Sequence, residues 1–364
     1  MINGDSTLSP TNEANSLFKL EFYEDENQDG YYDQNTEDRL EVEFDVDWNG
    51  WKMISFRYDD ADKLVLATGS RVRYLNFPGS ELKSIFYLRN LDDAEAIKKD
   101  LETSDNLVII GAGYIGLEAA AIAAKKNKTV TVIEMADRVM NRTVDPQISE
   151  YYLNLHQSYG VKFHFNTSLE TINKSSDSLE VVCSDGTEVK ADSVLIGAGV
   201  IPNIELAEDS GIYCDNGIIV DEFGQTNFKN IYACGDCTNH PNKILNKNLR
   251  LESVHNAMEQ AKTVASSVLN NPMEYSQVPW FWSDQYDHKL QIVGLSGDHD
   301  LVTMRGNTND AKFMLFYTKD EELIAVDAIN NPKEFLISRK LVANKVKIKP
   351  NVISDLNTNL NDLI

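Results

Sequence analysis

A glycine-rich turn between a predicted strand and a predicted helix constrains the fold of this chain more than any other feature. Gly111-Ala-Gly113-Tyr-Ile-Gly116 follows the apolar run Leu107 to Ile110 and leads into an alanine-rich segment, Ile115 to Lys126. We expect this segment to be a helix that ends with Asn127 in the left-handed conformation. Val130 to Ile133 reads as the next strand, which completes a βαβ unit and predicts a parallel α/β sheet.

The spacing of the three glycines is typical of a dinucleotide-binding turn. The first permits the turn, the second lets the backbone approach a pyrophosphate, and the third lets the helix pack on the strand. Glu134 ends the next strand, 23 residues after Gly111, where a carboxylate accepts hydrogen bonds from a ribose 2′-hydroxyl and repels a 2′-phosphate. We therefore expect NADH rather than NADPH to bind, with these contact residues: Gly111, Gly113, Tyr114, Ile115, Gly116 and Glu134. Two alternatives stay open: a turn with only a packing role, and a 2′-phosphate held by Arg138.

A second predicted strand delivers a Gly-Asp pair. Ile231 to Ala233 is followed by Cys234-Gly235-Asp236. Ligands of parallel sheets bind outside the carboxyl ends of the strands, where a carboxylate can hold sugar-like hydroxyls. The short strand Leu64 to Ala67 likewise stops at Thr68-Gly69. The Gly-Asp pattern resembles the second flavin motif of the two-dinucleotide flavoprotein reductases, in which the Asp contacts the ribityl chain of FAD.

Further segments extend this resemblance over residues 61–364. They are Asp62 to Arg73, Tyr87 to Arg89, Gly111 to Glu118, Gly199 to Asn203, Arg250 to Val254 and Pro279 to Tyr286. Together they are similar to the FAD-dependent NADH:ferredoxin reductases, of the rubredoxin and putidaredoxin reductase type, in the pyridine nucleotide-disulphide oxidoreductase superfamily. The resemblance implies an enzyme that takes hydride from NADH and passes single electrons to a small iron-sulfur protein, a ferredoxin or a rubredoxin.

The resemblance also implies roles for individual residues. Cofactor contacts fall on Ala67, Thr68, Gly69, Arg89, Gly199, Gly235, Asp236, Val254 and Trp282. Glu118 and Glu252 correspond to carboxylates on the nicotinamide side and are the expected catalytic residues. For Glu118, a place in the first turn of its helix, where its charge suits the helix dipole, is an equal alternative. Trp280 and Trp282 have either a redox role or a packing role between domains.

Other reactive side chains lie beside these motifs. His240 and His255 are expected to be structural, because the two cofactors perform the hydride chemistry and no catalytic histidine is required. Cys234 and Cys237 have the spacing of a redox pair, but they overlap the Gly-Asp turn. We therefore expect them to be strand and helix-entry residues rather than a working disulfide.

The motifs predict four parts. Residues 61–104 and 200–277 form a partial FAD-binding domain, residues 105–199 an NAD-binding domain, and residues 278–364 an α+β C-terminal domain with one helix beginning near Pro332. Further strands, Leu179 to Cys183 among them, are expected in parallel α/β sheets. The expected fold class is α/β: the two-dinucleotide-binding-domain flavoprotein fold with a truncated FAD domain, preceded by an acidic, β-rich segment at residues 1–60.

That first segment differs from the rest in composition. It holds 16 acidic and 4 basic residues, which accounts for -12 of the net charge of -23. Its glycines stand only at positions 4, 30 and 50, so it lacks the G-x-G-x-x-G with which the family binds the FAD pyrophosphate. Asn49-Gly50 predicts a hairpin within Leu40 to Tyr58, with Trp48 opposite Trp51 and Asp47 opposite Lys52.

An oxygen-rich stretch precedes the hairpin. Asp25, Asn27, Asp29 and Gly30 match the opening of a calcium loop, but Thr36 stands where a bidentate Glu is expected. Calcium binding and a solvated acidic loop both stay open. No metal site is predicted elsewhere.

Charge and hydropathy narrow the function classes. A net charge of -23 works against binding nucleic acids and anionic membranes. No apolar run reaches the roughly 18 residues of a membrane helix, and Met1 to Pro10 does not resemble a secretory signal, so we expect a cytoplasmic protein of unspecified oligomeric state. Two hypotheses remain: a flavin-dependent NADH:ferredoxin reductase, and a flavin-free NADH-binding or scaffold protein with an acidic calcium-binding or interaction module.

Overall fold

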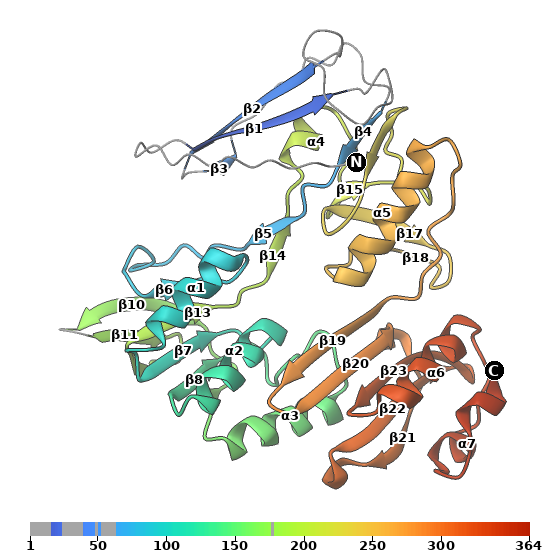
Figure 1. The fold of residues 1–364 in the computed structure, drawn as a ribbon. Helices are drawn as coiled ribbons and strands as arrows, with labels where there is room; N and C mark the ends of the chain where they lie inside the picture. Colours follow the sequence, from blue (N-terminus) through green and yellow to red (C-terminus); the bar gives the residue numbers. More distant parts are fainter. Residues whose placement is uncertain (1–15, 24–38, 48–49, 52–62, 176–177) are drawn as a thin grey trace. The chain divides into compact units, whose positions relative to one another are not determined.

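The computed structural model describes residues 16–23, 39–47, 50–51, 63–175 and 178–364 (Figure 1). The chain divides into two compact units, Met1–Asp62 and Lys63–Ile364. All the residues predicted to contact a cofactor belong to the second unit.

The first unit contains a three-stranded antiparallel sheet. Strand β2 (Arg39–Asp47) lies between β1 (Ser16–Tyr23) and β3 (Gly50–Trp51). The predicted hairpin register is wrong: Val46, not Trp48, lies opposite Trp51, and Asp47 lies opposite Gly50. Gly50 is the first residue of β3, whereas the prediction places it in the turn. The predicted calcium loop lies outside the described residues.

The second unit contains the predicted parallel sheet. Its strand order is β6-β13-β7-β8-β9, with every pair parallel. The strands are β6 (Ile85–Phe86), β7 (Asn106–Ile110), β8 (Thr129–Ile133), β9 (Lys162–His164) and β13 (Ser193–Ile196). The helices around it are α1 (Leu91–Asp100), α2 (Tyr114–Lys125) and α3 (Pro146–Ser158). Helix α2 ends as predicted, because Asn127 has a φ of 60°.

A separate antiparallel meander packs on this sheet. It consists of β10 (Leu169–Ser175), β11 (Ser178–Cys183) and β12 (Glu188–Ala191). The expectation that Leu179 to Cys183 lies in a parallel sheet is therefore wrong. The connections on both sides of β11 are too short for the crossover that parallel neighbours require. The meander supplies Leu179 and Val181 to a core on one face of the parallel sheet.

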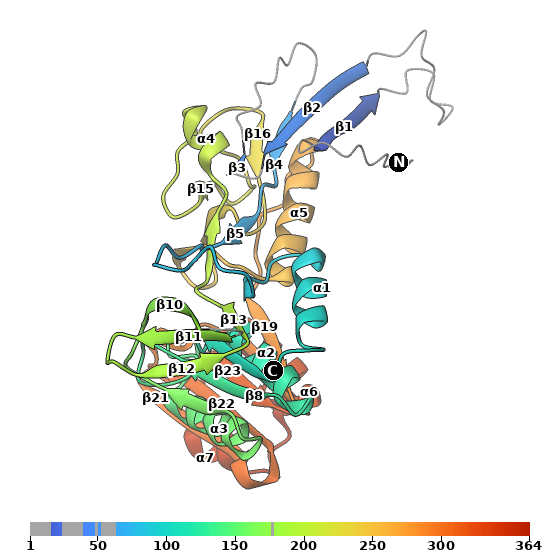
Figure 2. The ribbon, with the colours of Figure 1, turned by 90° about the vertical axis from the view of Figure 1, so that its left-hand side faces the viewer.

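The segments that flank the parallel sheet in sequence come together in space. β4 (Leu64–Leu66) pairs in parallel with β16 (Ile231–Ala233), and β5 (Ser70–Val72) pairs antiparallel with β14 (Val200–Pro202). The β5–β14 pair lies between the part that carries α5 and the part that carries α2 (Figure 2). The other elements of this region are α4 (Glu205–Asp209), β15 (Ile218–Ile219), β17 (Thr238–Asn242), β18 (Lys247–Leu249) and α5 (Val254–Val268).

The C-terminal part is α+β, as predicted, but it has two helices after its sheet rather than the single predicted one that begins near Pro332. Its antiparallel sheet has the order β19-β20-β23-β22-β21. The strands are β19 (Trp280–Gln285), β20 (His288–Gly294), β21 (Leu301–Asn307), β22 (Lys312–Lys319) and β23 (Glu322–Ile329). Helices α6 (Pro332–Ala343) and α7 (Pro350–Ser354) follow, and short 3₁₀ turns lie at Ser296–Asp298, Thr308–Asp310 and Leu360–Leu363.

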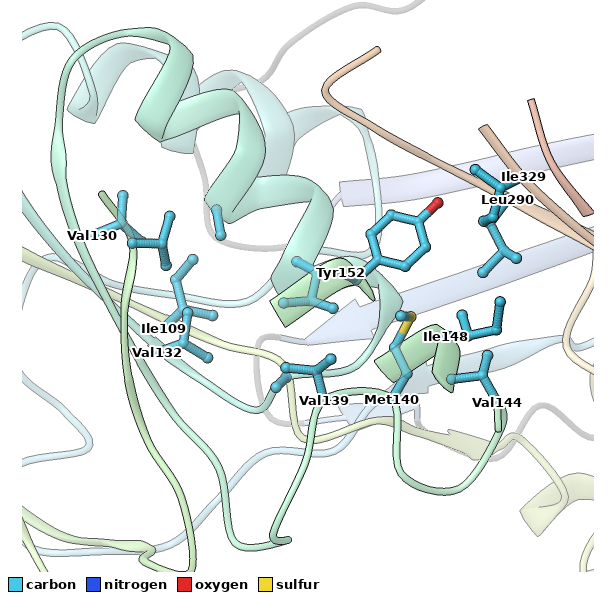
Figure 3. Packing of buried hydrophobic residues seen from close by; sticks show 14 of the residues in the cluster. Ile109, Val130, Val132, Val139, Met140, Val144, Ile148, Tyr152, Leu290 and Ile329 are labelled. Carbon is cyan, nitrogen blue, oxygen red and sulfur yellow. The ribbon is translucent and has the colours of Figure 1, made fainter. Parts of the chain in front are cut away.

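One hydrophobic core joins the parallel sheet to the C-terminal sheet. Figure 3 shows Tyr152 of α3 near Leu290 and Ile329 of the C-terminal sheet, with Ile109 and Val132 of the parallel sheet in the same cluster. These side chains are buried, with at most 1% exposure. Because this apolar core is shared, the parallel sheet and the C-terminal sheet form one folded body rather than two independently moving domains.

Candidate functional site

The three glycines of the turn before α2 have three different surroundings. Gly111 has a φ of +100°, which favours glycine. A Cβ on Gly116 would lie 2.2 Å from the Gly111 carbonyl oxygen, so only glycine lets the helix lie this close to the turn. A Cβ on Gly113 would meet no atom of the described residues within 4 Å. The turn is therefore crowded at its first and last glycines and open at the middle one.

The open glycine is also the N-cap of α2. Gly113 provides no side-chain cap for the first backbone N–H groups of this helix. Tyr114 and Ile115 are its first two residues, and Ile115 is exposed. Uncapped N–H groups beside an open glycine form a site for an anion such as a pyrophosphate.

Glu134 follows β8 and reaches back to this turn. Its Oε2 accepts a hydrogen bond from the Ala112 N–H at 2.7 Å, and its Oε1 accepts one from the Ala136 N–H at 2.8 Å. The carboxylate is thus held beside the glycine turn, at the end of the strand where a ribose is expected.

Arg138 holds its own loop together. Its guanidinium donates to the Val144 carbonyl at 2.9 Å, to the Ser149 hydroxyl at 2.6 Å and to the Asn141 carbonyl at 2.9 Å. These bonds use both terminal nitrogens of the guanidinium. They use three of its five N–H groups and fix the guanidinium within this loop.

Glu118 does not lie in the first turn of α2. It is the fifth residue of a helix whose first turn contains no acidic residue, so the helix-dipole alternative is wrong. Its Oε1 accepts hydrogen bonds from the Ser283 hydroxyl at 2.6 Å and from the Asp284 N–H at 3.3 Å. Burial raises the pKa of Glu118, while the bond from Ser283 acts in the opposite direction. Sequence reasoning missed both donors, which lie 165 and 166 residues away.

The predicted flavin residues meet where β4 and β16 end. Arg89 Nε donates to the Ser70 carbonyl at 2.7 Å, and its Nη2 lies 3.5 Å from Asp236 Oδ2. The Ser70 hydroxyl donates to the same carboxylate at 2.9 Å. The site pairs a carboxylate with a guanidinium, which suits recognition of a polar ligand chain with hydroxyl groups.

Two glycine turns shape this cluster. Gly69 and Gly235 have φ values of +64° and +87°. A Cβ on Gly69 would lie 3.9 Å from the guanidinium of Arg89. Gly235 donates from its N–H to Gln260 Oε1 at 2.7 Å, which ties the Gly-Asp turn to α5. Sequence reasoning missed Ser70 and Gln260 because serine and glutamine carry no pattern that distinguishes them from ordinary surface residues.

The loop after Gly69 is fixed to the segment that follows Gly199. Thr68 donates from its hydroxyl to the Asn203 carbonyl at 2.6 Å, and the Asn203 side chain donates to the Thr68 carbonyl at 2.8 Å. The Gly199 carbonyl accepts from the Arg73 N–H at 2.9 Å. The segment of the predicted residues Ala67 to Gly69 is therefore hydrogen-bonded to the segment that begins at Gly199.

The start of α5 forms another edge of the site. Val254 is its first residue and is 59% exposed. Glu252 stands two residues earlier, and its carboxylate pairs with the Arg250 guanidinium. No contact in the described residues joins Glu252 to Glu118, so the structure does not bring the two predicted catalytic carboxylates into one bonded group.

Strand β19 contacts both α2 and α5, because its successive side chains point to opposite faces. Phe281 packs on Tyr114 with 4.6 Å between ring centroids. Trp280 lies on the other face, 5.6 Å from the ring of His255, with the Arg339 guanidinium 4.9 Å from its centroid. Trp282 lies beside Trp280 at 5.3 Å. The pair packs at a junction of elements, which agrees with the packing interpretation and leaves a redox role untested.

The remaining reactive side chains have the expected surroundings. His240 is buried, and its pKa is lowered to about 4 by desolvation. Cys234 and Cys237 are free, and burial raises the pKa of the Cys234 thiol to about 11. A thiol with a raised pKa is a poor nucleophile, which argues against a redox pair.

The described residues fit a nicotinamide dinucleotide at the α2 turn and the flavin end of FAD at the Arg89–Asp236 cluster. The first fit rests on the open Gly113 cradle, and the second on the paired Arg89, Ser70 and Asp236. Across the described ranges, no group of three or more acidic, histidine or cysteine side chains is arranged to hold a metal ion. None of the helices in the described part combines the length and apolar character that crossing a bilayer requires.

Comparison with known proteins gives concordant matches. The family described as "Pyridine nucleotide-disulphide oxidoreductase" matches residues 23–261, and the family described as "Reductase C-terminal" matches residues 280–364. The first match thus begins inside the segment that the sequence predicted as a separate part.

Individual relatives are similar over most of the chain. Putidaredoxin reductase CamA of Pseudomonas putida is 39% identical over 311 residues, covering 84% of this chain and 74% of the relative. Rhodocoxin reductase of Rhodococcus erythropolis is 38% identical over 320 residues, covering 88% and 75%. A ferredoxin reductase structure from Rhodopseudomonas palustris has a TM-score of 0.80 and 39% identity, covering 82% of this chain and 74% of that one. The matches confirm the predicted resemblance and fold class.

Proposed function

Because this chain belongs to the pyridine nucleotide-disulphide oxidoreductase family, we propose that it is an FAD-dependent NADH:ferredoxin reductase, which delivers single electrons to a ferredoxin or rubredoxin. The proposal draws on relatives that are named reductases of putidaredoxin, rhodocoxin and rubredoxin. A solved structure similar to this chain is a covalent complex of putidaredoxin reductase with putidaredoxin (TM-score 0.80). An iron-sulfur protein is therefore the proposed partner.

The observation that carries the proposal is the presence of two ligand cradles in one folded unit. The Gly111–Gly116 turn would hold the pyrophosphate of NADH, with Glu134 at the adenosine ribose. Arg89, Ser70 and Asp236 would hold the flavin end of FAD. Bound FAD supplies the chemistry that converts a two-electron hydride donor into a source of single electrons.

The chain's own residues are proposed to position and select these ligands. The preference for NADH rests on Glu134, whose carboxylate repels a 2′-phosphate, and on Arg138, whose guanidinium is held within its own loop by three hydrogen bonds. Val254 would contact the flavin ring from the start of α5, and Glu118 and Glu252 would face the nicotinamide. Since its four cysteines are free, as is usual in a reducing compartment, we place the protein in the cytoplasm.

The test is a visible spectrum of the purified full chain, before and after incubation with FAD. We expect a flavin band that anaerobic addition of NADH bleaches, and reduction of an added ferredoxin or rubredoxin. Residues 1–60 lack the glycine spacing for the FAD pyrophosphate, so we expect weaker FAD binding than a complete cradle gives.

The control is the Asp236→Asn variant, which should take up less FAD while retaining NADH binding. A colourless protein that FAD does not reconstitute, yet that binds NADH, would support the flavin-free alternative instead.

A further inference from the structure

A chain of hydrogen bonds runs from the β19–β20 hairpin into helix α2. Alternate residues of β19 face the parallel sheet's helices: Phe281 packs on α2, Ser283 bonds to α2, and Gln285 bonds to α3. The chain is Tyr286 to His156, His156 to Gln285, Gln285 to Ser283, and Ser283 to Glu118.

The donor and acceptor at each bond follow from chemistry. Gln285 donates from Nε2 to the Ser283 hydroxyl oxygen at 3.1 Å, so that hydroxyl is left to donate to Glu118 at 2.6 Å. Gln285 Oε1 can only accept, so His156 carries its proton on Nε2, 2.8 Å away. His156 Nδ1 then accepts from the Tyr286 hydroxyl at 3.1 Å. In all four bonds the donor is the residue farther along the chain of bonds from Glu118, and the acceptor is the residue nearer to it.

The middle of this chain is shielded from water. Ser283, Gln285 and His156 are each 0% exposed. Desolvation lowers the pKa of His156 to about 4, so its neutral form persists at neutral pH. A buried network with every member paired is ordered and hard to rearrange. Glu118 Oε1 is therefore held in one place, and its Oε2 has no hydrogen-bond partner among the described residues.

We propose that Ser283 and Gln285 are positioning residues that hold the Glu118 carboxylate ready for the nicotinamide end of the coenzyme. This proposal rests on the proposed function. There the pyrophosphate lies at Gly113 and the adenosine ribose at Glu134, so the nicotinamide extends to the other side of the turn. Glu118 is the carboxylate of α2, and its free Oε2 is an acceptor suited to the N–H donors of a carboxamide.

The arrangement makes the NADH site depend on the C-terminal domain. Without the Ser283 hydroxyl, Glu118 retains the longer bond from the Asp284 N–H, at 3.3 Å. The half-buried carboxylate would then rotate toward water or take up a proton, because burial already disfavours its charge. Either response removes a fixed acceptor from the nicotinamide side and leaves the pyrophosphate cradle intact.

The experiment compares binding of NADH and of ADP-ribose, which lacks the nicotinamide, by calorimetry on the full-length chain. Ser283→Ala should weaken NADH binding about tenfold, the value of one hydrogen bond to a charged group, and leave ADP-ribose binding within about twofold. Glu118→Gln should do the same, and the double variant should lose no more than Glu118→Gln alone. Gln285→Met, which leaves Ser283 without its donor, should show a smaller loss in the same direction.

The matched control is Asp287→Asn. Asp287 pairs with Lys125 of α2 at 2.8 Å, so it joins the same hairpin to the same helix outside the chain of bonds. It should bind both ligands as the unmodified protein does. Equal weakening of NADH and ADP-ribose by Ser283→Ala, or no weakening at all, would overturn the positioning role, as would additive losses in the double variant. An unmodified chain that binds neither ligand would refute the proposed function itself.

Discussion

Exchanging single glycines of the α2 turn for alanine separates nucleotide binding from folding. In the ligand-free Gly113→Ala protein, no atom of the described residues lies within 4 Å of the new methyl group. The φ of -79° at this position also suits alanine. Gly113 is a helix N-cap, where alanine is less favourable than glycine, but alanine also restricts the unfolded chain. These effects oppose each other, so the free energy of unfolding should change by less than about 1 kcal/mol.

In the proposed function, the same methyl group would stand where the pyrophosphate approaches the turn. Overpacking of a close contact costs about 1–3 kcal/mol, which corresponds to roughly a 5- to 150-fold loss of NADH affinity. Calorimetric titration with NADH measures this loss, and thermal unfolding of the same sample measures stability. An unchanged NADH affinity in a folded Gly113→Ala protein would refute the assignment of this turn as the pyrophosphate cradle.

The Gly116→Ala variant makes the same substitution three residues later and should have the opposite effect, a loss of stability. Its methyl group would lie 2.2 Å from the Gly111 carbonyl oxygen and 3.3 Å from the Ile109 side chain, so α2 must move away from the sheet. We expect a loss of more than about 2 kcal/mol of stability, because backbone rather than a flexible side chain causes the clash. A Gly116→Ala protein as stable as Gly113→Ala would show that the helix and turn are not in the close contact described here.

Three further predictions concern other parts of the molecule. Arg89→Met should weaken FAD binding about tenfold in a fluorescence titration, whereas Lys247→Met, which removes an exposed ion pair with Asp298, should not; equal effects would argue against the flavin assignment. Buried His240 has a folded pKa of about 4, lower than its unfolded value, so its stability contribution is complete above about pH 6.5 and is lost as the pH falls toward 4. His240→Phe should therefore gain up to about 3 kcal/mol relative to the unmodified protein between pH 7 and pH 4 in denaturant titrations, and a constant difference would contradict the buried neutral state. Finally, the net charge of -23 opposes an acidic ferredoxin, so added salt should raise rather than lower turnover, and a steep fall with ionic strength would contradict this.

Much of the cofactor architecture follows from sequence because the patterns are local. The Gly111–Gly116 turn, its strand and its helix lie within one βαβ unit, and the steric demands on each glycine arise from neighbours in that unit. The strand that ends in Gly235-Asp236 is equally local. The family resemblance assigned Arg89 and Asp236, 147 positions apart, to the same cofactor, but neither their contact nor the pairing of this strand with β4 was predicted.

Other features were decided by tertiary contacts alone. The hydrogen-bond partner of Glu118 comes from β19, 165 residues away, and no helical pattern around Glu118 indicates it. The Arg138 guanidinium is held by three hydrogen bonds within its own loop, which its spacing from the glycine turn does not indicate. The strand at 178–183 alternates between half-buried and buried residues, and its short connections place it in an antiparallel meander rather than in the expected parallel sheet.

The amino-acid sequence by itself therefore determined the glycine turn, the strand and helix alternation and the α+β character of the C-terminal part. The folded structure decided which carboxylates are held and by what. Local sterics are encoded within a few neighbouring residues, whereas the orientation of a buried carboxylate depends on donors that only packing brings near.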